Sequence, residues 1–159
     1  MTNPSDPQFD FPVFERMAPT VVEAMTMLSK VISASGLEKP LAELVKLRVS
    51  QINGCEFCLQ FHLNLARKYG LADEKIDALA EWRSADLYSS RERAALAWAE
   101  SLTLMAQGPR AVRVYSNLKS EFSDSEVAFL TAAIAQINAW NRIAGGLDFP
   151  PLPLDRANG

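Results

Sequence analysis

Signals that start and stop α-helices recur along almost the whole chain, and they constrain its fold more than any other feature. Ser89-Ser-Arg-Glu92 and Ser123-Asp-Ser-Glu126 are capping boxes, in which serine and glutamate satisfy the free backbone groups of a first helical turn. Prolines that suit a helix start and glycines that suit a helix end mark the other boundaries, at Pro19, Pro40, Pro109, Gly36, Gly70 and Gly145-Gly146. These signals leave little of the chain for any other regular structure.

The segments between the signals carry helical periodicity. We predict helices over about 19–36, 40–51, 55–69, 73–80, 89–106, 109–122 and 123–146. In the last of them Val127, Leu130, Ile134 and Ile137 fall on one face. No segment shows sustained apolar-polar alternation between turn signals, so no β-sheet is expected. The fold class is therefore all-α, a single-domain bundle of six to seven helices.

At 159 residues the chain is expected to form one domain. We divide it into an N-terminal arm (1–18), a helical domain (19–146) and a Pro-rich C-terminal tail (147–159). The arm holds three prolines, which disfavour a long helix, and several aromatic residues, which gain by burial. We expect arm and tail to pack on the body or on a neighbouring subunit, which favours a homo-oligomer.

Charge and composition narrow the classes of partner. The net charge is −3 and 48% of the residues are hydrophobic, values typical of a soluble globular protein. This balance gives no reason to expect nucleic acid or an anionic membrane as a partner. No apolar run approaches the ~20 residues of a membrane helix. The first residues lack the basic and apolar segments of a secretory signal, so we expect a cytoplasmic protein.

Chemistry concentrates in one stretch of the chain. Cys55 and Cys58 are its only cysteines, and His62 is its only histidine. At the start of the third predicted helix, free N–H groups and the helix dipole favour thiolates. The spacing places all three side chains on one helical face, with the two sulfurs close enough for a disulfide. In the cytoplasm such a pair is more often catalytic or metal-binding than structural.

Glu43 lies on the preceding helix, which is apolar nearly all round and is therefore expected to be central. Burial there favours the protonated carboxyl. Because Asn53-Gly54 breaks the chain, the two helices are predicted to form an antiparallel hairpin in which Glu43 faces His62. Glu43 can then orient or protonate His62, directly or through a water.

The complete spacing, glutamate, eleven residues, C-x-x-C, three residues, histidine, resembles the signature of a known family. It is similar to the alkylhydroperoxidase D-like branch of the carboxymuconolactone decarboxylase family. The resemblance is close over Leu41–Gly70 and looser over Ser90–Pro151, through the segments around Trp98 and Trp140. It implies an all-helical protein that forms dimers, trimers, hexamers or other homo-oligomers and reduces small hydroperoxides with thiols.

The resemblance also implies roles for the four residues. Cys58 attacks the peroxide, Cys55 resolves the sulfenic acid to a disulfide, and an external dithiol or thiol protein restores both. Glu43 and His62 form the proton relay, and no cofactor or metal is implied. The residues themselves leave the order of attack open, since the helix start also favours a Cys55 thiolate. One departure is Phe57, which stands where well-studied peroxidase members carry a second histidine.

Other functions remain open at this point. A zinc site would use Cys55, Cys58, His62 and Glu43 as its four ligands, although one helix would then supply three of them. A lactone decarboxylase of the same family would need acid-base groups and a carboxylate pocket but no cysteine pair. A non-catalytic redox sensor or metal-binding module is the third alternative. The simplest interpretation is that the two cysteines are buried and inert.

The remaining notable residues have structural interpretations. Four aromatic residues are expected in the core: Trp98, Trp140, Tyr115 and Phe122. Asn138 and Asn141 are expected on a helix surface or in interhelix hydrogen bonds. Four arginines are expected on solvated faces: Arg91, Arg93, Arg110 and Arg113.

Overall fold

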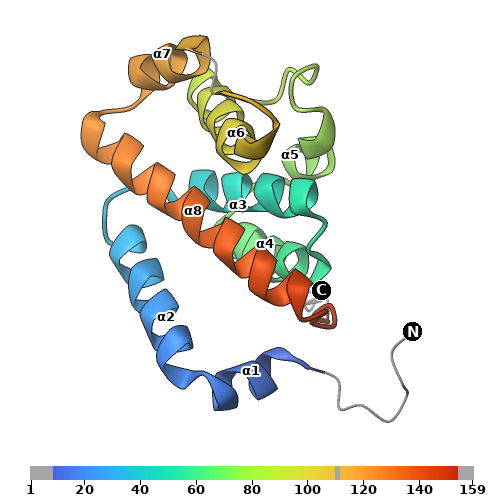
Figure 1. The fold of residues 1–159 in the computed structure, drawn as a ribbon. Coiled ribbons are helices and arrows are strands. Elements are labelled where there is room, and N and C mark those ends of the chain that lie inside the picture. Colours follow the sequence, from blue (N-terminus) through green and yellow to red (C-terminus); the bar gives the residue numbers. More distant parts are fainter. Residues whose placement is uncertain (1–8, 110–111, 154–159) are drawn as a thin grey trace.

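The structure, a computed structural model, describes residues 9–109 and 112–153. These residues form eight α-helices, two short 3₁₀ helices and no β-strand (Figure 1). The α-helices are α1 (Phe11–Met17), α2 (Pro19–Ser33), α3 (Lys39–Asn53), α4 (Glu56–Lys68), α5 (Asp73–Asp77), α6 (Ser90–Thr103), α7 (Val112–Glu121) and α8 (Asp124–Gly146), and the 3₁₀ helices are η1 (Leu79–Glu81) and η2 (Met105–Gln107). The all-α class is confirmed, and the helix count exceeds the predicted six to seven because of α1.

Helix α1 forms inside the arm, where the prolines were taken to disfavour a long helix. The carboxylate of Asp10 caps it by accepting a hydrogen bond from Val13 N at 2.9 Å. Pro12 lies in the first turn, where its missing N–H breaks no helical hydrogen bond. A helix of only 7 residues therefore accommodates Pro12 and still packs Phe11 and Phe14, partly buried, against the larger cluster of the body.

Helices α3 and α4 form the predicted antiparallel hairpin. Gly54 ends α3 in the left-handed conformation, with φ 65°, which glycine adopts without steric cost. The Cys55 N–H donates to the carbonyl of Ser50 across the turn, at 3.1 Å. In Figure 1, α8 crosses both helices of the hairpin, and α6 packs against α3. Helix α3 is consequently enclosed, as its sequence predicted.

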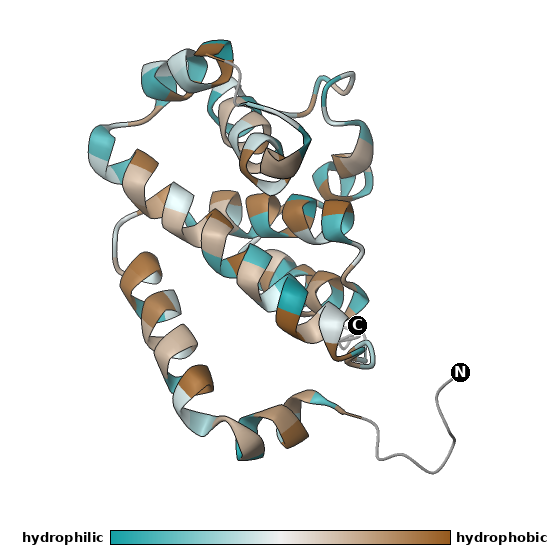
Figure 2. Cartoon of the chain, in the orientation of Figure 1, coloured by the Kyte–Doolittle hydropathy of each residue, from teal (hydrophilic) through white to brown (hydrophobic). Residues whose placement is uncertain are grey.

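Two clusters of buried residues hold the bundle together. The larger one joins α3 to α6, α7 and α8 and includes Val45, Leu130 and Ile134, each with 0% exposure. The smaller one joins α3 and α4 to η1 through Leu44 and Leu79. Figure 2 shows apolar and polar residues interspersed along the helices, as expected when each helix buries one side. No helix in the described ranges is long and apolar enough to span a bilayer.

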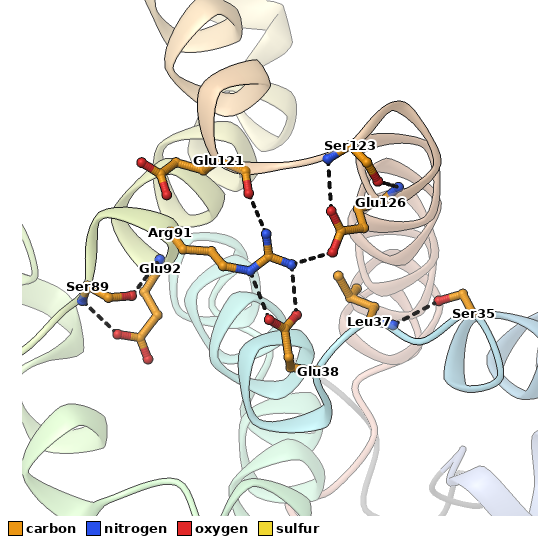
Figure 3. A network of polar contacts seen from close by, with 9 residues as sticks. All are labelled: Ser35, Leu37, Glu38, Ser89, Arg91, Glu92, Glu121, Ser123 and Glu126. Carbon is orange, nitrogen blue, oxygen red and sulfur yellow. Dashed lines mark hydrogen bonds and ion pairs between the residues drawn. The ribbon is translucent and has the colours of Figure 1, made fainter.

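Arg91 of α6 ties its helix to three other segments, the start of α3, the end of α7 and α8, so its predicted place on a solvated face is wrong (Figure 3). Its guanidinium contacts both carboxylate oxygens of Glu38, at 2.8 and 3.0 Å, and Glu126 Oε1 at 2.6 Å. It also donates to the carbonyl of Glu121 and lies 3.9 Å from the ring centre of Phe122. The hydrogen bond from Arg91 lowers the pKa of Glu38. The position of Arg91 depends on partners that are distant in the sequence, which local sequence patterns do not indicate.

The other structural predictions have mixed outcomes. Arg93 is also not free in solvent, because it donates to backbone carbonyls that include those of Tyr88 and Trp82. Arg113 is exposed as predicted, and Arg110 lies outside the described residues. Trp98 and Phe122 are buried and Trp140 is half-buried against the larger cluster, but Tyr115 is 39% exposed. Tyr115 was wrongly assigned to the core because α7 is covered on only one side, where Leu118 is buried.

Asn138 and Asn141 take part in interhelix hydrogen bonds, as predicted. Asn53 Nδ2 donates to Asn138 Oδ1 at 3.0 Å and to Asn141 Oδ1 at 2.8 Å. Asn141 Nδ2 in turn donates to Ser50 Oγ at 3.1 Å. These bonds link α8 to the last turn of α3, just before the cysteine pair.

The described parts of arm and tail pack on the body, which confirms one of the two predicted placements. Phe11 and Phe14 of α1 meet Trp140 of α8 and Phe149 of the tail, with ring centres 6.0 to 6.5 Å apart. Phe57 of α4 joins this group, 5.3 Å from Phe149 and 6.2 Å from Phe11. The arm is thereby held against the start of α4.

Candidate active site

The cysteine pair lies at the N-terminus of α4. Cys55 is the N-cap residue, and its sulfur accepts a hydrogen bond from Cys58 N at 3.3 Å. Cys55 therefore precedes the first turn, in which it was predicted, while Cys58 lies within that turn. The two are joined by a disulfide, with Cα atoms 5.3 Å apart, and each residue is 3% exposed. The N–H groups of a first helical turn have no acceptors within the helix, and the helix dipole is positive there, which favours thiolates once the disulfide is reduced.

His62 lies one turn beyond Cys58 and is also buried. Its Nδ1 is 2.6 Å from Glu43 Oε2, so the predicted partnership across the hairpin is direct and uses no bridging water. The rings of His62 and Phe61 lie nearly perpendicular to each other, with centres 5.1 Å apart. Glu43 and Phe61 thus hold the imidazole in one orientation.

Glu43 is buried, as predicted, but its environment favours the carboxylate. Burial alone raises the pKa of Glu43, and the hydrogen bonds and charges of His62 and Lys46 outweigh it, so the net pKa is lowered. The Lys46 ammonium contributes from 2.9 Å. The expectation that Glu43 holds a proton is therefore wrong, because the hydrogen bonds and charges of His62 and Lys46 together outweigh burial.

Burial lowers the pKa of His62, against the opposing effect of Glu43. The imidazole is accordingly neutral at pH 7, with its proton on Nδ1 donating to the Glu43 carboxylate. The other ring nitrogen, Nε2, then carries a lone pair. A neutral histidine fixed in this tautomer is suited to accept a proton from a thiol.

A pocket of about 380 Å³ opens onto this group. Cys58 and His62 line it, and Cys55 is not among its lining residues. Most of its wall is apolar and comes from five segments of the chain: Phe11 and Pro12 (α1), Val22 (α2), Phe57 and Phe61 (α4), Ile137 and Trp140 (α8), and Leu152 (tail). A ligand in this pocket would meet the sulfur of Cys58 before that of Cys55.

Sequence reasoning missed part of this site. Lys46 was not singled out, although its position three residues after Glu43 on a helix was a usable signal. The contributions of Phe11, Pro12 and Leu152 carried no such signal, because only the tertiary fold brings the arm and tail to the pocket.

The four predicted residues do not form a metal site in this structure. The described ranges contain no group of three or more His, Cys, Asp or Glu side chains arranged to hold a metal ion. Glu43 directs its two oxygens to His62 and Lys46, and the two sulfurs are bonded to each other. The arrangement is that of a dithiol/disulfide pair with a proton acceptor beside it.

Comparison with known proteins places this site in a family. The model of the carboxymuconolactone decarboxylase family matches residues 19–101, more than half of the chain. The chain belongs to the carboxymuconolactone decarboxylase family. A relative from Bacillus subtilis, the uncharacterized protein YdfG, is 34% identical over 131 residues, which cover 82% of this chain and 89% of YdfG. The predicted family is thereby confirmed.

Two further relatives carry names from the alkylhydroperoxidase D branch of the family. A crystal structure from Agrobacterium tumefaciens, of a protein of unknown function described as a putative antioxidant defence protein AhpD, superposes with a TM-score of 0.84. It is 35% identical, and the match covers 88% of this chain and 96% of that one. Alkyl hydroperoxide reductase AhpD from Hyphomonas neptunium is 48% identical over 48 residues, 30% of this chain and 27% of that protein. The fold is therefore AhpD-like.

Proposed function

We propose that this protein is a thiol-dependent hydroperoxide reductase in which Cys58 attacks the substrate. One observation carries the proposal: Cys58 and His62 line the same pocket, while Cys55 bonds to Cys58 without lining it. A peroxide in the pocket would thus meet the sulfur of Cys58, and His62 lines the same pocket as a proton acceptor. Cys55 would then be the resolving thiol, and this is the order of attack that we propose.

The reaction follows from these positions. His62 Nε2 takes the proton of the Cys58 thiol, and the thiolate attacks the terminal oxygen of R–O–O–H. The O–O bond breaks, Cys58 becomes a sulfenic acid, and the RO⁻ leaving group takes the proton from His62 to give ROH. Cys55 attacks the sulfur of Cys58, forming the disulfide and releasing water. An external dithiol, or a thiol protein, then reduces the disulfide by exchange.

Glu43 supports both proton transfers without changing its own charge. Its hydrogen bond to Nδ1 keeps Nε2 free and stabilises the imidazolium that exists between the two transfers. Lys46 offsets the buried negative charge of Glu43. The names of the AhpD-like relatives support this reading, since they describe alkyl hydroperoxide reduction and antioxidant defence.

We further propose that copies of the chain associate through α2, in line with the expected cytoplasmic homo-oligomer. The outer face of α2 and the end of α1 expose large apolar side chains: Met17 at 75%, Met27 at 59%, Val31 at 49% and Val21 at 42%. Exposed apolar patches of this kind are typical of protein interfaces. Sedimentation of the wild type and of a Met27→Lys, Val31→Lys variant tests whether copies of the chain associate through α2. A monomeric wild type would contradict this association.

Steady-state turnover of an organic hydroperoxide with a dithiol reductant tests the enzymatic proposal. Cys58→Ser should abolish turnover, because no sulfur then faces the pocket. Without reductant, Cys55→Ser should still consume one equivalent of peroxide, leaving on Cys58 a sulfenic acid that a dimedone probe traps. Turnover that survives in Cys58→Ser contradicts the proposal. Activity on a lactone substrate that survives loss of both cysteines would instead support the decarboxylase alternative.

A further inference from the structure

A second pocket, of about 290 Å³, adjoins the first one. Both pockets lie between α2 and α4, and they share Thr26, Ser29, Lys46, Phe61 and His62 as lining residues. The first pocket takes its α4 residues from the start of that helix, and the second extends to Tyr69 at its end. From these shared residues we infer that the two pockets form one groove along α4, with His62 at the junction.

The second pocket differs from the first in its charge. Three lysines line it, Lys30, Lys39 and Lys46, and Glu43 is the one carboxylate among its lining residues. Lys46 is paired with Glu43, which leaves the other two ammonium groups without a carboxylate in this wall. Lys39 Nζ lies 5.3 Å from the ring centre of Tyr69, which lines the pocket too. This end of the groove is suited to an anion.

The hydroxyl groups of the second pocket add hydrogen-bond donors to that charge. Thr26, Ser29 and Ser33 of α2 line this pocket. The Ser29 hydroxyl already donates to the carbonyl of Met25, so Thr26 and Ser33 would supply the donors. Ser29 and Thr26 also line the first pocket, so the polar side of the groove is continuous. A carboxylate beside an ammonium group accepts such bonds readily.

The length of the groove sets the size of a ligand that would use both ends. Eleven residues separate Cys58 from Tyr69 along α4. With a rise of 1.5 Å per residue, they span about 16 Å. An apolar chain that starts at the sulfur and ends in a carboxylate at the lysines must therefore be long. Small hydroperoxides would occupy the first pocket alone.

We propose that the second pocket binds the carboxylate of a long-chain fatty acid, and that fatty-acid hydroperoxides are the preferred substrates. The apolar chain would lie in the first pocket against Phe57, Phe61 and Trp140, with the hydroperoxide at Cys58. The carboxylate would lie between Lys30 and Lys39. The substrate preference rests on the proposed peroxidase function, whereas binding of the acid does not.

Binding is measured first, on the oxidised protein, with linoleate and methyl linoleate as probes. We expect linoleate to bind more tightly than the ester, and the difference to shrink at high salt because the charges are partly exposed. Exposed charge pairs contribute modestly, so Lys30→Gln, Lys39→Gln should weaken linoleate binding about fivefold, which corresponds to about 1 kcal/mol. Arg113→Gln, Lys119→Gln removes the same charge from α7, away from the groove, and is the matched control.

Turnover is measured second, with linoleic acid hydroperoxide and its methyl ester. The expected result is a preference for the acid that the Lys30, Lys39 variant loses and the α7 control keeps. Equal turnover of both substrates, or equal binding of both probes, overturns the proposal and leaves the peroxidase function standing. Preferential binding of linoleate without turnover of either hydroperoxide contradicts the peroxidase function and supports the binding site alone.

Discussion

Replacing Glu43 with glutamine preserves the size of the side chain but removes the charge that holds two neighbouring groups. Glu43 accepts hydrogen bonds from His62 Nδ1 at 2.6 Å and from Lys46 Nζ at 2.9 Å. A glutamine oxygen can replace one of these bonds, and its amide nitrogen, which only donates, can replace neither. Lys46, whose side chain is 15% exposed, also loses its counter-charge.

The structure sets the size of the effect. One lost hydrogen bond to a charged group corresponds to about 1.5–3 kcal/mol. Breaking a fully buried ion pair costs about 3–5 kcal/mol, but Lys46 has partial access to solvent and can relax. We therefore expect the free energy of unfolding of Glu43→Gln to be about 2 to 3 kcal/mol lower than that of the wild type at pH 7. Urea denaturation followed by circular dichroism measures it.

The same substitution should slow oxidation of the reduced protein by an organic hydroperoxide. The imidazole loses the acceptor that fixes its tautomer, so we expect the rate to fall by about 10²-fold, the lower end of a general-base contribution. Lys46→Gln is the matched control, since it leaves the bond between Glu43 and His62 in place and should lose less. A Glu43→Gln protein that reacts within a factor of two of the wild type would refute the relay.

Three further predictions concern pH, the Arg91 network and the residue before Cys58. Because burial lowers the pKa of His62, the unfolded chain protonates this imidazole at a higher pH than the folded protein does. The free energy of unfolding of the wild type should therefore fall as the pH drops below 6.5. Urea titrations of His62→Gln should show a flatter pH dependence. Arg91→Met should lower the free energy of unfolding by about 1 to 2 kcal/mol, whereas Arg113→Met, on an exposed site, should change it by less than about 0.5 kcal/mol; equal effects would contradict the network. Phe57→His should accelerate thiol oxidation in stopped-flow measurements while costing about 1 kcal/mol of aromatic packing, and an unchanged rate would show that the missing histidine does not limit the reaction.

The sequence predicted the parts of the molecule that local rules decide. Both capping boxes form, and the glycine at position 54 turns the chain as expected. Because that hairpin has one geometry, the partnership of Glu43 with His62 followed from spacing alone. The apolar character of this helix nearly all round likewise predicted that α3 lies at the centre of the bundle.

The failures involve contacts between segments that are distant in sequence. Helix α1 escaped prediction because so short a helix depends on packing, here of Phe11 and Phe14 against α8 and the tail. Arg91 was assigned to solvent because its partners come from three other segments. The protonation of Glu43 was predicted wrongly from burial alone, because the hydrogen bonds and charges of His62 and Lys46 together lower its pKa.

The central claim is that Cys58 reduces a peroxide and Cys55 resolves the product. The most direct measurement is the mass and thiol content of the fully reduced protein after one equivalent of an organic hydroperoxide. We predict the loss of two hydrogens, no free thiol, and one intramolecular disulfide between Cys55 and Cys58, with one equivalent of the alcohol formed. A protein that keeps both thiols, or that gains oxygen on one sulfur without forming the disulfide, would contradict the account.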